Sequence, residues 1–177
     1  MATLIRAASS WLTDHPRQAL AVLALAACGV ATASILLTHW LRLNPCYLCI
    51  FQRLLSIKLA LCFGLGALLP WRSGRQIFTL FAGLIALCGL GAAGFQSWEQ
   101  WYPEVVGSCV GTEPNLIERL VEWMGSQWPS LFMVSGLCES KELEILGLSL
   151  ANWSFLAFTG FAMAAFYLLW LGLKQNR

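Results

Sequence analysis

The strongest constraint on the fold of this chain is a set of four long stretches with few or no charged residues. They cover residues 18–41, 46–69, 76–98 and 151–173. A hydrocarbon core of about 30 Å is crossed by roughly 20 helical residues, and each stretch reaches that length. Only 11% of the 177 residues are charged, against about 25% in an ordinary soluble domain. We therefore expect an all-α integral membrane protein, with residues 1–177 forming one domain built on a bundle of four transmembrane helices.

The first stretch could also be the apolar part of a signal peptide, because Arg6 and Arg17 precede it. Signal-peptide apolar regions have about 7–15 residues and are followed by small residues at a cleavage site. The stretch here is longer, and Arg42 follows it. We expect the first helix to be retained.

Charged residues divide unequally between the two sides of the predicted bundle. Four spans place both termini and the loop 70–76 on one side, and the loops 42–45 and 99–150 on the other. The first side holds Arg6, Arg17, Arg72, Arg75, Lys174 and Arg177, with Asp14 as its only acid. All eight glutamates fall within 99–150. The positive-inside rule places the first side in the cytoplasm, and nothing in this distribution points to nucleic-acid binding.

The seven cysteines separate by depth in the predicted bundle. Cys28, Cys62 and Cys88 fall inside the spans, where cysteine behaves as a small hydrophobe, so we interpret them as packing residues. The remaining four lie on the extracytoplasmic side, where disulfides form and persist. They are Cys46, Cys49, Cys109 and Cys138. Four cysteines allow three connectivities, and the closeness of the first two favours a bridge between them and a second bridge between the other two.

The Cys46–Cys49 pair is more suited to redox chemistry than to stabilising the fold, because closing so short a loop adds little stability. Asn44 is expected to cap a helix with Pro45 at its first position, which puts Cys46 in the first turn, where a thiolate is favoured. A structural staple is one alternative, and a zinc site built from all four extracytoplasmic cysteines is another. We expect no metal, because that side oxidises thiols and the other two cysteines form no second Cys-x-x-Cys. Ile50 replaces the histidine that c-type haem attachment requires.

Arg53 is a cation inside the second stretch, and such a residue is costly in a membrane and indicates a functional site. It lies one turn below Cys49 on the same helical face. A fixed cation beside a thiolate suits a lipid-soluble acceptor whose carbonyl oxygens gain charge on reduction, and a quinone fits this description. The alternative is that Arg53 extends its guanidinium to the headgroups.

Two further polar residues, Gln96 and His39, lie near the extracytoplasmic ends of the third and first helices. Either could donate a hydrogen bond to a quinone carbonyl, so both are candidate cofactor-binding residues. The alternative for each is a polar side chain satisfied at the membrane interface. Lys58 lies deeper in the second stretch on another face, and the sequence assigns it no role.

The long extracytoplasmic segment contains a helical pattern over residues 114–125, with an asparagine cap and a glycine stop. We expect a short helix on the membrane surface there. Such a helix would hold the loop close to the bilayer, so that Cys109 and Cys138 stay within reach of the Cys46–Cys49 pair. Gly136 beside Cys138 suggests a mobile backbone, which exchange between separate disulfides would need.

Several motifs follow one another in a fixed order along nearly the whole chain. His39 precedes the run Asn-Pro-Cys-Tyr-Leu-Cys-Ile-Phe-Gln-Arg at 44–53, and a long loop with a cysteine follows. Ser-Gly-Leu-Cys-Glu at 135–139 and Leu-Gly-Leu at 146–148 then precede the last helix. Together these motifs resemble the DsbB family of bacterial quinone-dependent disulfide-forming proteins. The chain departs from the best-known member at Gln52, where that member is acidic, and at Lys58.

The resemblance implies an inner-membrane thiol:quinone oxidoreductase. A reduced periplasmic thioredoxin-fold partner of the DsbA type would attack Cys109 of the Cys109–Cys138 bridge, and Cys138 would then attack Cys46. Cys49 would react beside Arg53 with ubiquinone or menaquinone, and the electrons would leave as quinol. Such a protein sustains disulfide bond formation, with cytoplasmic termini and four active cysteines facing the periplasm.

Two other functions are compatible with the pattern. A vitamin K epoxide reductase-like protein also joins a quinone to a Cys-x-x-Cys in a four-helix bundle, but there the motif lies toward the end of the bundle, whereas here it opens the second helix. A non-enzymatic membrane scaffold with two structural disulfides would satisfy the topology as well. The sequence does not specify the quinone, the client protein or the oligomeric state.

Overall fold

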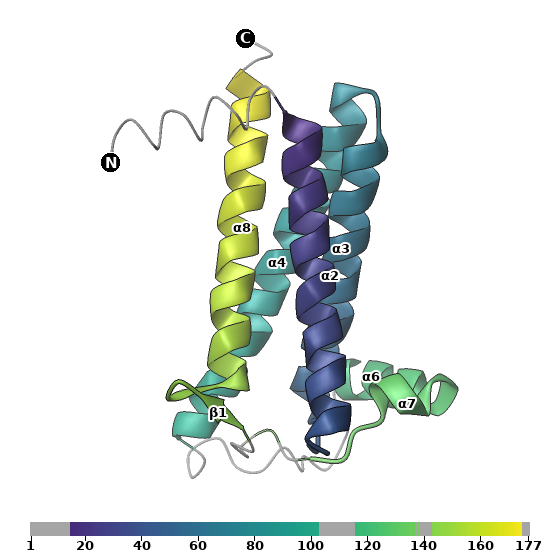
Figure 1. Cartoon of the computed structure of the whole chain (residues 1–177), viewed down its shortest axis with the longest axis vertical. Helices are drawn as coiled ribbons and strands as arrows, with labels where there is room; N and C mark the ends of the chain where they lie inside the picture. The colour runs from purple at the N-terminus through teal and green to yellow at the C-terminus, as the bar shows by residue number, and fades with distance from the viewer. Residues whose placement is uncertain (1–14, 103–115, 137, 139–142, 175–177) are drawn as a thin grey trace.

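Four long helices run side by side in the computed structural model, which describes residues 15–102, 116–136, 138 and 143–174. They are α2 (Pro16–Trp40), α3 (Tyr47–Leu68), α4 (Arg72–Trp101) and α8 (Leu150–Lys174). Each helix is long and apolar enough to cross a membrane, so the predicted four-helix membrane bundle is confirmed. The start of α2 and the end of α8 lie at one end of the bundle, and the start of α3 lies at the other (Figure 1).

The ends of the helices differ from the predicted stretches by a few residues. α2 begins at Pro16, whose fixed φ suits the first turn of a helix. α4 extends beyond the predicted 76–98 at both ends, from Arg72 to Trp101. The prediction stopped where charges appear, but charged side chains at the membrane boundary can reach water while their backbone stays helical.

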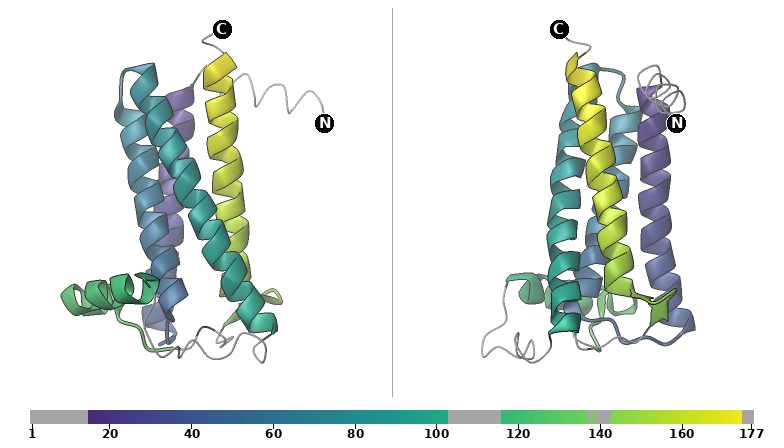
Figure 2. Two further views of the ribbon diagram at one scale, coloured as in Figure 1. Left: turned by 180° about the vertical axis from the view of Figure 1, so that it is seen from behind. Right: turned by 90° about the vertical axis from the view of Figure 1, so that its left-hand side faces the viewer.

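Helix packing follows the order of the chain: α3 packs against α2 and α4, and α4 packs against α8. Figure 2 shows α4 slanting from α3 at one end of the bundle to α8 at the other. The α4–α8 contact is close because small residues face each other across it, including Ala86 and Ala165, which are fully buried. A side chain at Gly89 would collide with the ring of Phe158. Small residues that let helices approach closely are typical of membrane bundles.

The three cysteines inside the spans do not share one environment. Cys62 packs partly against the core, as predicted, whereas Cys28 and Cys88 are exposed on the outside of their helices. The interpretation of these two as packing residues was wrong. Lipid and protein core are both apolar, so composition within a span does not say which of them a cysteine faces.

A surface helix extends sideways from the cysteine end of the bundle (Figure 1). It is α6 (Leu116–Gln127), followed by the single turn α7 (Pro129–Phe132), which confirms the predicted surface helix. It continues two residues past the predicted stop at Gly125 and ends just before Pro129, which cannot extend it. Its buried Val121 packs on Ile50 and Leu54 of α3.

A small hairpin, absent from the sequence predictions, leads into the last helix. β1 (Glu144–Ile145) pairs antiparallel with β2 (Leu148–Ser149). The two turn residues, Leu146 and Gly147, both have positive φ, the geometry of the tight turns that join such strands. The indole of Trp153 in α8 donates a hydrogen bond to the carbonyl of Ile145, which ties the hairpin to α8.

Candidate active site

Cys46 and Cys49 lie at the start of α3, with Cys46 as the N-cap residue and Cys49 in the first turn. The predicted cap at Asn44 with Pro45 as the first helical residue was wrong, because the helix begins at Tyr47. The carbonyl of Pro45 instead accepts hydrogen bonds from the backbone N–H groups of Ser135 and Gly136. The thiol of Cys46 donates to the sulfur of Cys49 at 3.3 Å, so the pair is a dithiol in contact.

Cys138 lies beside this pair. It is buried and packs with Cys46 and Leu48 in one small cluster, with Cys49 at its edge. Cys46 and Cys49 carry free thiols, so the predicted bridge between them is not formed in this structure. The predicted Cys109–Cys138 bridge stays a prediction. Cys109 lies outside the described residues. The described part of the chain therefore brings three of the four predicted redox cysteines to one place.

The backbone before Cys138 is fixed against the start of α3. The two hydrogen bonds that the Pro45 carbonyl accepts measure 3.1 Å from Ser135 and 3.3 Å from Gly136. A side chain at Gly136 would collide with the carbonyl of Asn44, so only glycine allows the two segments to approach this closely. The structure gives Gly136 a packing role instead of the mobility expected from the sequence.

Gln96 of α4 faces the sulfurs. It is 2% exposed, and its amide nitrogen donates to the sulfur of Cys49 at 3.0 Å and to that of Cys46 at 3.3 Å. The amide of Gln52 donates to the Gln96 carbonyl at 2.8 Å, which turns the N–H groups of Gln96 toward the sulfurs. Donors aimed at a sulfur atom stabilise negative charge that develops on it.

The surroundings of Cys46 disfavour its thiolate form. Hydrogen bonding with Cys138, then hydrogen bonding with Cys49 and burial, raises the pKa of the Cys46 thiol far above its usual range. The sulfur of Cys49, which accepts from both Cys46 and Gln96, is therefore the member of the pair placed to carry negative charge.

Arg53 lies one turn beyond Cys49 and is 3% exposed. Its guanidinium donates to the carbonyl of Leu131 at 2.6 Å and to the hydroxyl of Thr38 at 2.8 Å. Longer hydrogen bonds reach the hydroxyl and the carbonyl of Ser34. These acceptors are all neutral, so they fix the group without cancelling its charge. Arg53 is thus held inside the protein, between α2 and α7.

A cavity of about 450 Å³ opens beside the sulfurs, between α2 and α8. Apolar residues such as Val30, Leu37 and Ala157 form much of its wall. The residues that supply polar or sulfur atoms to the wall include Cys46, Cys49, Gln52, Arg53, Gln96, Gln100, Ser34 and Ser149. An apolar pocket with a few convergent polar groups is the usual form of a small-molecule site.

His39 takes a different position from the other predicted cofactor residues. Its side chain is exposed near the end of α2 and makes a 3.1 Å hydrogen bond with the carbonyl of Ser130. It does not belong to the wall of the cavity. The bond ties α2 to the α7 turn, which also supplies Leu131 to Arg53.

Comparisons with known proteins identify a single family, and the match covers almost the whole chain. The family model described as "Disulfide bond formation protein DsbB" matches residues 16–168. A protein named Disulfide bond formation protein B from Dechloromonas aromatica is 44% identical over 140 residues, covering 79% of this chain and 84% of that protein. A protein of the same name from Paracidovorax citrulli is 34% identical over 161 residues, covering 91% of each chain. This chain belongs to the DsbB family.

Membership of the DsbB family implies disulfide oxidoreductase activity. Cys46, Cys49 and Cys138, whose sulfurs gather at one point, are the groups in the described structure that suit such chemistry. The buried amides and the apolar cavity keep most water away from these sulfurs. Hydrogen bonds and charges therefore act on them more strongly than they would in water.

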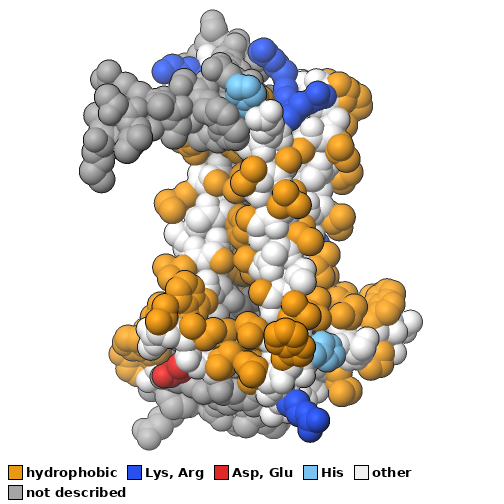
Figure 3. Space-filling model, viewed as in Figure 1, with side chains coloured by type: hydrophobic (Ala, Val, Ile, Leu, Met, Phe, Trp, Pro, Cys, Tyr) orange, Lys and Arg blue, Asp and Glu red, His pale blue; other side chains and the backbone are white. Residues whose placement is uncertain are grey.

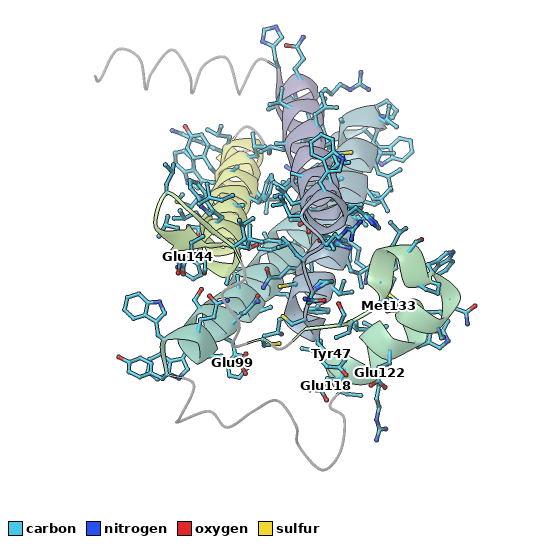
Figure 4. All side chains as sticks on the ribbon, turned by 60° about the horizontal axis from the view of Figure 1, so that its bottom comes forward. Tyr47, Glu99, Glu118, Glu122, Met133 and Glu144 are labelled. Atoms are coloured by element: carbon cyan, nitrogen blue, oxygen red, sulfur yellow. The ribbon has the colours of Figure 1, made fainter. Side chains whose placement is uncertain are left out.

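Several residues of this DsbB-family site were missed by sequence reasoning. Gln52 orients Gln96, and the hydroxyl of Ser149 donates to the carbonyl of the Gln100 side chain at 2.6 Å on the cavity wall. The available signal was their chemistry, since uncharged polar side chains within or beside an apolar stretch must find partners inside the protein. Figure 4 shows the surroundings of this end of the bundle, with Tyr47 close to Glu118 and Glu122 of α6, and the Tyr47 hydroxyl donates to the Glu122 carboxylate.

Proposed function

We propose that this DsbB-family protein is an inner-membrane thiol:quinone oxidoreductase that reoxidises a periplasmic DsbA-type dithiol protein. The observation that carries the proposal is the meeting of three cysteines, two of which line one apolar cavity. Cys46 and Cys49 line the cavity, and Cys138 packs on Cys46 from the loop side. Electrons can therefore enter from the loop and leave toward the lipid.

This placement supports transfer between the two cysteine pairs. In the oxidised protein, a Cys138 thiolate attacks the sulfur of Cys46 in a Cys46–Cys49 bridge. The Cys138–Cys46 bond forms, the Cys46–Cys49 bond breaks, and the electron pair goes to the sulfur of Cys49. Cys138 is freed for this attack when the partner's thiolate bonds to Cys109. The packing of Cys138 on Cys46 supports the central step.

Gln96 is placed to lower the activation free energy of that step. When Cys49 leaves as a thiolate, the amide donor 3.0 Å from its sulfur is already in place. Arg53, one turn away, adds a fixed positive charge. Groups oriented before the reaction avoid the cost of reorganisation and are effective stabilisers of developing charge.

The cavity fits a quinone. Its wall is mostly apolar, its polar groups gather beside the sulfurs, and it lies between two membrane-spanning helices that pack only loosely on each other. Arg53, Gln96 and Gln100 are the residues that would hold the carbonyl oxygens of the ring. A bound quinone would supply a lipid-soluble acceptor of two electrons and two protons.

The test is an oxidation assay with purified protein and a reduced DsbA-type partner, run in parallel with ubiquinone and menaquinone. We expect quinone-dependent oxidation of the partner, and its loss on Cys49→Ser because the Cys46–Cys49 pair can no longer cycle. The matched control is Cys28→Ser, which removes an exposed thiol of α2 and should leave turnover unchanged. Full turnover with Cys49→Ser would exclude the proposed route, and oxidation independent of added quinone would exclude quinone as the acceptor.

A further inference from the structure

A second cavity lies at the opposite end of the bundle, far from the cysteines. It has a volume of about 880 Å³ and is bounded by the first turns of α2 and α4 and the last turns of α8. Arg17, Arg72, Arg75 and His15 line it together with leucines that include Leu20 and Leu168. We call it the arginine cavity. The disulfide chemistry uses none of these residues.

The arginines of this cavity gather positive charge without a described carboxylate nearby. Arg17 and Arg72 both lie close enough to Arg75 to act on it electrostatically. Within residues 15–102, 116–136, 138 and 143–174, the carboxylates are those of Glu99, Glu118, Glu122 and Glu144, which all belong to the cysteine end. On the face drawn in Figure 3, Lys and Arg side chains lie at both ends of the molecule, whereas an acidic side chain is visible only at the end opposite to where α8 finishes. Like charges held together this way repel each other, so binding an anion would relieve the repulsion.

The backbone adds to the positive potential of the arginine cavity. α2 and α4 both begin at this end, and neither N-cap residue makes a side-chain capping hydrogen bond. The positive ends of two helix dipoles therefore lie beside the arginines.

The apolar part of the wall narrows the choice of anion. Leu168, Leu169 and Leu171 of α8 line the cavity together with the arginines. A free phosphate ion has no apolar group that could pack against these leucines. A phospholipid carries both a phosphodiester, which can pair with the arginines, and acyl chains, which can pack on the leucines. The cavity also lies where the spanning helices begin and end, which is the depth of lipid headgroups. Basic pockets between transmembrane helices are known to bind acidic lipid headgroups.

We propose that the arginine cavity is a binding site for an anionic phospholipid, with the phosphodiester at Arg17, Arg72 and Arg75 and the apolar chains along the leucines of α8. Occupation would join the starts of α2 and α4 to the end of α8. The site is independent of the redox reaction, so it can be tested on protein that carries no quinone.

The experiment titrates the full chain in detergent micelles with phosphatidylglycerol or with phosphatidylcholine of the same acyl chains, and counts bound lipids by native mass spectrometry. We expect phosphatidylglycerol to bind at least about tenfold more tightly. Arg75→Gln should weaken its binding about fivefold, the effect of one cation near an anionic lipid. Lys174→Gln is the matched control, because that lysine lies at the same end but stacks on Trp170 instead of lining the cavity, and its loss should change binding by less than about twofold.

Three outcomes would overturn the proposal. They are equal binding of the two lipids, equal effects of the two substitutions, and full displacement of phosphatidylglycerol by inorganic phosphate, which would make the cavity a site for free anions. Thermal unfolding without lipid checks that each variant is folded. If Arg75→Gln fails that check, Arg72→Gln carries the same test, because Arg72 is exposed and its replacement disturbs no packing. The result holds whether or not the redox proposal is correct.

Discussion

At the scale of single residues, the site depends on the direction of one amide group. Gln96 has a donor end and an acceptor end, and only the donor end can support a sulfur anion. Gln52 fixes the orientation of the Gln96 amide, because its own N–H group donates a 2.8 Å hydrogen bond to the side-chain oxygen of Gln96. Gln52 itself touches neither a reacting sulfur nor an electron acceptor through this bond, so we assign it as a positioning residue.

Gln52→Glu tests this assignment with almost no change in size. A carboxylate can only accept, so the Gln96 amide should turn its N–H groups toward the new acid and its oxygen toward the sulfurs. We expect alkylation of Cys49 at neutral pH to slow about tenfold or more, the loss of one hydrogen bond to a charged group. Peptide mass spectrometry after timed alkylation measures this rate. Gln76→Glu, an amide-to-acid change at the far end of the bundle, is the control; equal rates for both variants would remove Gln52 from the mechanism.

At the scale of helices and loops, the sequence predicted the elements well and their contacts poorly. The apolar stretches gave four spans because length and hydropathy alone decide whether a helix can cross a membrane. The same face of α3 does carry Cys49 and Arg53, as helical spacing requires. The acceptors of Arg53, however, come from α2 and α7, and no local pattern in α3 encodes them. The N-cap was misplaced for a similar reason, because Pro45 is engaged by residues 135 and 136, which are distant in sequence.

The contact between the start of α3 and residues 135–136 gives a prediction at this scale. Gly136→Ala should push the segment that carries Cys138 away from Cys46, because the added methyl group meets the Asn44 carbonyl. Overpacking of this kind costs about 1–3 kcal/mol, so we expect about tenfold slower oxidation of the dithiol partner. Oxidation of a reduced Cys46–Cys49 pair by quinone in a single turnover should stay at the parent rate. Gly160→Ala is the control, since a side chain there meets nothing; equal slowing of both reactions would argue for general damage instead.

At the scale of the whole molecule, the two ends of the bundle are chemically different. The cysteine end holds the described carboxylates and the surface helix, and the other end holds the arginine cavity. An asymmetric charge distribution of this kind fixes the orientation of a membrane protein, because positively charged loops stay in the cytoplasm. The proposed redox route needs that orientation, since disulfides form in the periplasm and not in the cytosol.

Site-directed labelling measures the orientation directly. In a background with all seven cysteines replaced by serine, Arg42→Cys and Ser73→Cys place single thiols at exposed positions on opposite ends. We expect a membrane-impermeant maleimide to label the Arg42→Cys thiol in spheroplasts, and to label the Ser73→Cys thiol only after lysis. The positive-inside rule requires this result because Ser73 lies between Arg72 and Arg75. The reverse pattern would place Cys46, Cys49 and Cys138 in the reducing cytosol, where thiols are kept reduced and a route that oxidises a periplasmic partner could not operate.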